Sequence, residues 1–209
     1  MRAFLYVLAA ITGYLVSGWN PAITFSKAIY KKDIRECGSG NPGFTNFRRN
    51  FGNRYAWHVL VLDLSKAALV IALFAGLLSK QGAGYSFAAA YTGLFCMLGH
   101  AFPVWYKFKG GKGGKGFLVS MSIIWFIDWR AGLIALVLML ILLFTTKYMS
   151  LATVVAMLTC PIILLVFNAP ISVVLIYGAC VLFMAIRHKE NFKRLKNGTE
   201  SKFKVKTKA

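Results

Sequence analysis

The sequence predicts an all-α, polytopic integral membrane protein of about seven transmembrane helices. Hydrophobic residues make up 58% of the 209 residues, and the mean hydropathy is +0.62. Ordinary globular domains contain roughly 45–50% apolar residues, so the natural solvent of this chain is lipid. The formal net charge of +19 must then be carried by the polar segments between the apolar runs. Such segments favour an anionic partner.

Apolar runs separated by short charged or Gly/Pro segments place the helices in order. The expected spans lie near residues 3–23, 57–78, 85–106, 117–128, 131–146, 149–167 and 170–186. Several are shorter than the ~20 residues that cross a full hydrocarbon core, so they need flanking loop residues or a thinner bilayer. The first run has no basic segment beyond Arg2 and no small-residue cleavage site, so we expect a retained span and not a cleaved signal.

Seven spans place the loops alternately on the two faces. Loops 24–56, 107–116, 147–148 and 187–209 then share one face, and this face holds 21 of the 25 Lys and Arg residues. On the other face, with the N-terminus, lie only Arg2, Lys80 and Arg130. By the positive-inside rule, we expect the N-terminus outside and the C-terminus in the cytoplasm. We expect one membrane domain over 1–188 and a basic, disordered cytoplasmic tail over 189–209.

Several other residues have structural interpretations. The four cysteines lie far apart with no histidine at ligand spacing, which indicates neither a zinc site nor a disulfide framework. Asp63 and Lys66 are three residues apart on one helix face, and we expect them to pair and so reduce the cost of charge in the membrane. His58 and His100 lie near span ends, where a hydrated histidine needs no catalytic role.

The first basic loop contains a glycine-rich segment, Gly38 to Asn46, flanked by Arg35, Arg48 and Arg49. Glycines let the backbone turn sharply and present N–H groups to an anion, and arginines can clamp phosphate oxygens. A flexible surface loop whose charges only set topology explains the composition equally well.

The second basic loop contains Gly99 to Pro103, followed by a glycine-lysine tract from Phe108 to Gly116. The tract is similar to a phosphate cradle, but no Ser or Thr follows the lysine and no βαβ pattern surrounds it. A nucleotide triphosphatase is therefore disfavoured. A plain linker with topogenic charges is the alternative.

The third basic segment, Arg187 to Arg194, follows the last span. If the helix continues, residues 187, 188, 191 and 194 share one face. His188 and Asn191 then point together, framed by the two arginines. Basic residues commonly flank the cytoplasmic end of a membrane span, which accounts for the arginines but not for the histidine and the asparagine.

Together the three segments resemble the bacterial acyl-phosphate-dependent glycerol-3-phosphate acyltransferases, and the resemblance covers nearly the whole chain. It implies transfer of a fatty acyl group from acyl phosphate to the first-position hydroxyl of sn-glycerol 3-phosphate, giving lysophosphatidic acid and phosphate. It also implies a multi-pass protein of the inner membrane whose site faces the cytoplasm. The implied partners are the two substrates and membrane lipids, without a coenzyme A thioester, a metal or another cofactor.

The resemblance, followed position by position along the three motifs, also implies which residues of this chain form the site. Ser39 and His188 are the expected catalytic residues. The expected substrate-binding residues are Gly38, Gly40, Asn41, Gly43, Thr45, Asn46, Arg49, Lys109, Gly110, Gly111, Lys112 and Asn191. This chain departs from the family pattern by an extra Gly-Lys-Gly before Phe117. Counting from His100 selects Lys112 as the motif lysine, whereas counting back from Phe117 selects Lys115.

An acyl phosphate is already activated, so the protein mainly has to position two anions and neutralise charge on the leaving phosphate. The proton acceptor stays open among His188, Ser39 as a relay and a substrate phosphate oxygen. The resemblance favours substrate assistance, and a covalent acyl-Ser39 lacks an orienting carboxylate in these motifs.

Two other classes of function were weighed. A non-enzymatic channel or carrier for phosphate esters is the alternative, but most spans lack the ionisable residues of a transport path. Nucleic-acid binding by the basic tail is disfavoured because aromatic residues do not interleave with the charges.

Overall fold

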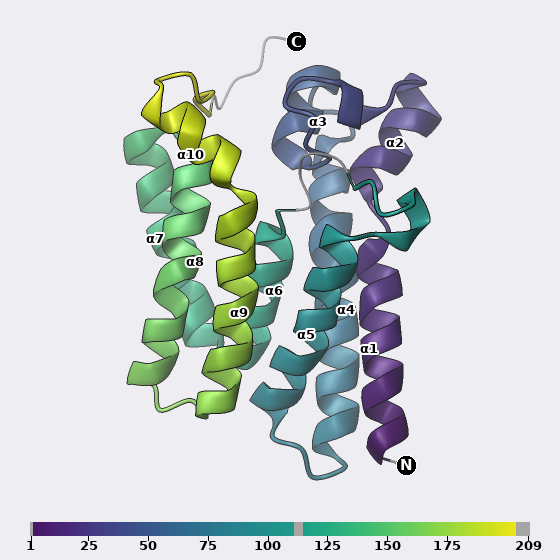
Figure 1. The fold of residues 1–209 in the computed structure, drawn as a ribbon, viewed down its shortest axis with the longest axis vertical. Coiled ribbons are helices and arrows are strands. Elements are labelled where there is room, and N and C mark those ends of the chain that lie inside the picture. The colour runs from purple at the N-terminus through teal and green to yellow at the C-terminus, as the bar shows by residue number, and fades with distance from the viewer. Residues whose placement is uncertain (1, 111–114, 204–209) are drawn as a thin grey trace.

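The computed structural model describes residues 2–110 and 115–203, and within these ranges the chain forms helices and no strand. The helices that run along the long axis (Figure 1) are α1 (Arg2–Gly18), α4 (Ala56–Ser79), α5 (Tyr85–Ala101), α6 (Phe117–Ile127), α7 (Trp129–Thr146), α8 (Met149–Val166) and α9 (Ile171–Arg187). One end of the bundle carries the shorter elements α2 (Pro21–Tyr30), η1 (Ile34–Glu36), α3 (Phe44–Phe51), η2 (Val104–Tyr106) and α10 (Lys189–Lys196). The N-terminus lies at the opposite end.

Each expected span coincides with one of the long-axis helices, but not all of these helices can cross a bilayer. By length and composition, the described residues contain five candidate spans, and six if α9 and α10, bent by 50°, count as one. Helix α6 has only 11 residues, which is about 16 Å and half of a hydrocarbon core. Because α6 packs against α4, α5, α7, α8 and α9, the bundle encloses a short central helix.

The helix boundaries follow from local chemistry. Helix α1 ends before Asn20, whose side chain accepts a hydrogen bond from the Ile23 amide at 3.0 Å. Pro21 then occupies the first position of α2, where its missing N–H costs nothing. Asp128 separates α6 from α7 in the same way, accepting from the Arg130 amide at 2.9 Å.

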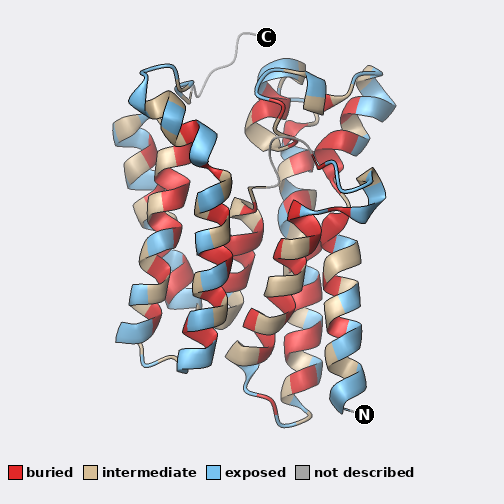
Figure 2. Ribbon diagram, viewed as in Figure 1, coloured by how far each residue is buried: buried red, intermediate tan, exposed pale blue. Residues whose placement is uncertain are grey.

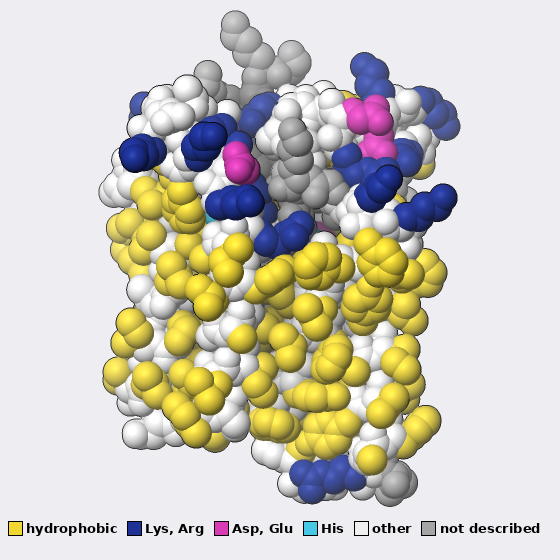
Figure 3. All heavy atoms as spheres, viewed as in Figure 1, with side chains coloured by type: hydrophobic (Ala, Val, Ile, Leu, Met, Phe, Trp, Pro, Cys, Tyr) yellow, Lys and Arg dark blue, Asp and Glu magenta, His cyan; other side chains and the backbone are white. Residues whose placement is uncertain are grey.

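Burial and charge divide the molecule as a bilayer requires. Buried residues face the interior of the bundle (Figure 2), while large apolar side chains such as Leu69, Phe144 and Leu175 are 65–70% exposed on its outside. In Figure 3 a hydrophobic band covers the middle, and most Lys and Arg gather at the end that carries the C-terminus. In this view a smaller basic patch lies at the opposite end. This arrangement agrees with the loop assignment drawn from the sequence.

Two polar segments are more ordered than expected. The loop expected over 24–56 contains α2, η1 and α3 around a small core of its own, formed by Ala22, Ile23, Ile34, Phe47, Ala56 and Val59. The tail after His188 was expected to be disordered, but it forms α10, and the Phe203 amide donates to the Lys147 carbonyl at 2.7 Å. The described part of the tail is therefore folded against the end of the bundle.

Candidate functional site

A cavity of about 810 Å³ opens among the polar groups of the positively charged end and extends alongside α6, from Phe117 to Phe126. One part of its wall is polar, formed by Ser39, Asn41, Thr45, Asn46, Arg49, Lys115, Ser150, Thr153, His188, Asn191, Arg194 and Glu200. The other part is apolar, formed mainly by side chains of α4, α6 and α7: Trp57, Leu60, Leu64, Phe117, Leu118, Met121, Trp125, Phe126, Leu136, Met139, Leu140 and Leu143. The cavity therefore suits a ligand with an anionic head and a long apolar tail.

The glycine-rich loop is held in shape by Asn46, which is only 2% exposed. Its Oδ1 accepts from the Ser39 amide at 3.1 Å, and its Nδ2 donates to the Cys37 carbonyl at 2.9 Å. Gly38 adopts φ +53°, and a Cβ there would lie 2.5 Å from Asn46 Oδ1. Asn46 thus braces the loop that brings Ser39, Asn41 and Gly43 to the cavity wall, whereas Gly38 and Gly40 lie outside the lining.

The three arginines flanking this loop make different contacts. Arg49 lines the cavity, as expected of a phosphate ligand. Arg35 instead pairs with Asp33 and donates to the Lys109 carbonyl at 2.6 Å, so it joins the first basic loop to the second. This guanidinium also holds the pKa of the Asp33 carboxyl well below its usual range. Arg48 is buried and donates to Asn53 Oδ1 at 2.7 Å.

The second loop brings Lys115 into the cavity, where its Nζ donates to Asn191 Oδ1 at 2.6 Å. Burial, reinforced by the nearby Arg194, lowers the pKa of Lys115 to about 8. Lys109 is exposed and Gly110 packs against Pro103, and neither belongs to the lining. Gly111 and Lys112 lie outside the described residues. Lys115, the lysine selected by counting back from Phe117, is therefore the one that the described residues place in the cavity.

His188 and Asn191 line the same cavity, as the helical spacing predicted, although the chain bends between α9 and α10. His188 is 3% exposed, and its Nδ1 lies 2.8 Å from the Met184 carbonyl. A carbonyl only accepts, so Nδ1 carries the proton and Nε2 is left as an acceptor. Burial lowers the pKa of His188 to about 4, so the ring is neutral near pH 7.

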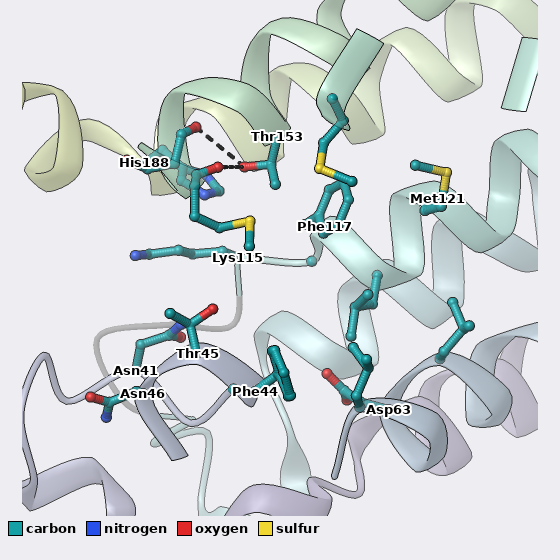
Figure 4. A pocket seen from close by; sticks show the side chains of 18 of the residues that line it. Asn41, Phe44, Thr45, Asn46, Asp63, Lys115, Phe117, Met121, Thr153 and His188 are labelled. Atoms are coloured by element: carbon teal, nitrogen blue, oxygen red, sulfur yellow. Dashed lines mark hydrogen bonds between the residues drawn. The ribbon is translucent and has the colours of Figure 1, made fainter. Parts of the chain in front are cut away.

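Figure 4 shows how these groups converge. His188 and Thr153 lie on one side of the pocket, Asn41 and Thr45 lie on the facing side, and Lys115 extends between them. Phe117 and Met121 line the part that continues away from the polar groups. The polar and apolar parts of the wall are thus continuous.

The residue that sequence reasoning missed is Glu200, which lies in the segment that we expected to be a disordered tail. Its carboxylate accepts from Ser150 Oγ at 2.8 Å, from Asn191 Nδ2 at 2.7 Å and from Arg194 Nε at 2.7 Å. These donors lower the pKa of Glu200 against the opposing effect of burial. Glu200 therefore orients Asn191, which in turn accepts from Lys115. The only available signal was the rarity of acids, since the chain has six Asp and Glu in all.

A family model described as glycerol-3-phosphate acyltransferase matches residues 7–198. The chain belongs to this family. The glycerol-3-phosphate acyltransferase of Rhodopseudomonas palustris (strain BisB5) is 35% identical over 198 residues, covering 95% of this chain and 96% of the relative. That of Pelagibacter ubique (strain HTCC1062) is 34% identical over 200 residues, covering 96% and 98%. The expected family and its enzyme class, an acyltransferase of phospholipid synthesis, are therefore confirmed.

Solved structures agree with this assignment. The chain is similar to the glycerol 3-phosphate form of PlsY (YgiH), an integral membrane glycerol 3-phosphate acyltransferase, with a TM-score of 0.84 and 28% identity. For the lysophosphatidic acid form of PlsY the values are 0.80 and 27%, and both comparisons cover 96% of each chain. The all-α membrane fold is therefore confirmed. Among residues 2–110 and 115–203, no three His, Cys, Asp or Glu side chains gather as metal ligands.

Proposed function

We propose that this enzyme transfers a fatty acyl group from acyl phosphate to the first-position hydroxyl of sn-glycerol 3-phosphate, releasing lysophosphatidic acid and inorganic phosphate. The observation that carries the proposal is the cavity with a cationic, hydrogen-bonding end and an apolar continuation. Both substrates are phosphate esters or anhydrides, and only one has a long apolar tail. A site of this shape binds their phosphates together and keeps the tail apart from water.

The apolar wall suits the acyl chain. Leu60 and Leu64 of α4, Met121 of α6 and Leu140 of α7 face the same space. Each buried methylene contributes about 0.8 kcal/mol, so a chain lying along this wall supplies binding energy far from the reacting atoms. That energy can position the acyl carbon beside the acceptor hydroxyl.

The phosphates suit the polar end. Arg49 and Lys115 supply two cations, and the first turn of α3 lines the cavity with Thr45 and Asn46. Arginine can bind phosphate oxygens in pairs, and the positive end of a helix favours an anion. We assign Lys115 to the leaving phosphate or the acceptor phosphate in place of Lys112, because Lys115 reaches the cavity and contacts Asn191.

The proton of the acceptor hydroxyl is best taken by a substrate phosphate. His188 presents Nε2 to the site, but a pKa of about 4 makes it a weak base near pH 7. A phosphate ester has a second pKa of about 6 and is the stronger base by about two units. His188 Nε2 can then accept a hydrogen bond from the second hydroxyl of glycerol 3-phosphate, which orients the polyol. Ser39 Oγ accepts from the Asn41 amide at 3.4 Å, which orients the serine without removing its proton.

We place the site on the cytoplasmic face of the inner membrane, with the N-terminus outside. The support is the gathering of Lys and Arg around the cavity end (Figure 3) together with the positive-inside rule. Water-soluble glycerol 3-phosphate then arrives from the cytoplasm, and the acyl donor arrives from the bilayer.

The test offers labelled glycerol 3-phosphate and either palmitoyl phosphate or palmitoyl-coenzyme A to purified protein in lipid. We expect label in lysophosphatidic acid with palmitoyl phosphate alone. Transfer from palmitoyl-coenzyme A alone would refute the donor assignment. Absence of transfer from either donor by a monodisperse, thermally stable preparation would refute the reaction and favour the anion carrier.

A further inference from the structure

A second polar cluster lies within the membrane-spanning part of the bundle and is not used by the mechanism above. Lys66 Nζ lies 2.8 Å from Asp63 Oδ1, 2.7 Å from the Trp19 carbonyl oxygen and 3.2 Å from His100 Nδ1. Asp63, Lys66 and His100 are 5%, 6% and 9% exposed. Moving two charges out of water is unfavourable, and the attraction between them offsets only part of that cost. Ionisable groups at this depth therefore indicate a function.

The contacts of Lys66 determine the protonation of His100. An ammonium group has three N–H donors and no acceptor, and the carboxylate of Asp63 stabilises its charge. Because Lys66 donates to Nδ1, that ring nitrogen carries no proton. A neutral imidazole then bears its proton on Nε2.

His100 lines the cavity beside a stretch of α4 that carries both polar and apolar lining residues. Both His100 and Asp63 line the cavity, and the α4 residues on either side of Asp63 in this lining are Leu60 and Leu64. Met97, one turn before His100 on α5, packs directly against Gly116, the neighbour of Lys115. This contact holds α5 against the residue next to Lys115, the cation that we assign to a phosphate, and both His100 and Lys115 line the same cavity. An acyl phosphate has its carbonyl group between its phosphate and its tail.

We propose that Asp63 and Lys66 hold His100 as the neutral Nε2–H tautomer and that this N–H donates to the carbonyl oxygen of the acyl donor. The inference rests on the proposed function. In the transfer, the acceptor hydroxyl oxygen bonds to the acyl carbon, the bond from that carbon to the phosphate oxygen breaks, and the hydroxyl proton leaves on the phosphate. Negative charge builds on the carbonyl oxygen in between, and an oriented donor stabilises it. Asp63 and Lys66 are positioning residues.

The first test compares His100→Gln with His100→Asn. The glutamine amide nitrogen reaches the position of Nε2, whereas the asparagine amide reaches only that of Nδ1. We expect His100→Gln to keep kcat within about tenfold of the wild type, and His100→Asn and His100→Phe to lose about 100-fold in kcat, as for one donor to a developing oxyanion. KM for glycerol 3-phosphate should change little. Equal losses in the Gln and Asn variants, with unchanged thermal stability in lipid, would overturn the proposal.

The second test reads the tautomer directly and needs no activity. The chain has three histidines, so a sample labelled with ¹⁵N in histidine gives few signals, and the His100→Gln variant assigns the relevant pair. We expect an unprotonated Nδ1 and a protonated Nε2, with a mixture of tautomers in the Asp63→Asn/Lys66→Met variant. A proton on Nδ1 in the wild type would overturn the proposal. Wild-type transfer from palmitoyl phosphate is measured alongside. Absence of transfer would refute the proposed function, whereas the tautomer of His100 is decided by the NMR signals alone.

Discussion

Replacing Lys115 with methionine removes the cation that lies 2.6 Å from Asn191 Oδ1 in the cavity and keeps most of the side-chain length. Two unit charges 4 Å apart attract by about 4 kcal/mol at an effective dielectric constant near 20. After desolvation, a hydrogen bond to a charged group contributes about 1.5–3 kcal/mol. At 1.36 kcal/mol per factor of ten, this range corresponds to about a 10- to 150-fold loss. We expect that loss in kcat/KM.

The assay is steady-state transfer from palmitoyl phosphate to labelled glycerol 3-phosphate, with each substrate varied in turn. Lys107→Met is the matched control, because Lys107 is an exposed lysine of the same loop outside the cavity lining. Lys112→Met tests the other way of counting the motif. The assignment to Lys115 fails if Lys112→Met loses activity by this amount while Lys115→Met stays within threefold of the wild type.

Three further predictions follow from individual side chains. Since the pKa of Lys115 is about 8, its charge is lost as pH rises, so kcat/KM should fall above about pH 8; Lys115→Arg should move this fall to higher pH, and an unshifted profile would contradict the assignment. Gly38→Ala should lower the free energy of unfolding by about 1–2 kcal/mol, because Gly38 adopts φ +53°, and thermal melting comparable to the wild type would argue against the Asn46 brace. Ala68→Phe should fill the apolar part of the cavity and shift the ratio of decanoyl to palmitoyl transfer about tenfold, as for one or two excluded methylenes; an unchanged ratio would place the acyl chain elsewhere.

The positions of the helices, the grouping of the loops and the family could all be predicted from the sequence alone. Each depends on residues that are close together in the chain. Apolar side chains are stable in lipid, and a backbone in lipid must form its hydrogen bonds within a helix. The hydropathy of the sequence therefore located α1, α4, α5 and α6 to α9. The alternation of basic and weakly charged loops predicted which segments share an end of the bundle. Three glycine-rich or basic segments were sufficient to identify the family, and Ser39, Arg49, His188 and Asn191 all line the cavity.

Tertiary structure decided the rest, because these contacts join residues far apart in the chain. Lys115 and Asn191 are 76 residues apart, Glu200 and Ser150 are 50 apart, and Lys66 and Trp19 are 47 apart. Residue spacing predicts neighbours within a helix, as for Asp63 and Lys66, but it does not predict which helices pack together. The contact of Lys115 with Asn191, the folding back of Glu200 and the approach of Lys66 to His100 all depend on that packing.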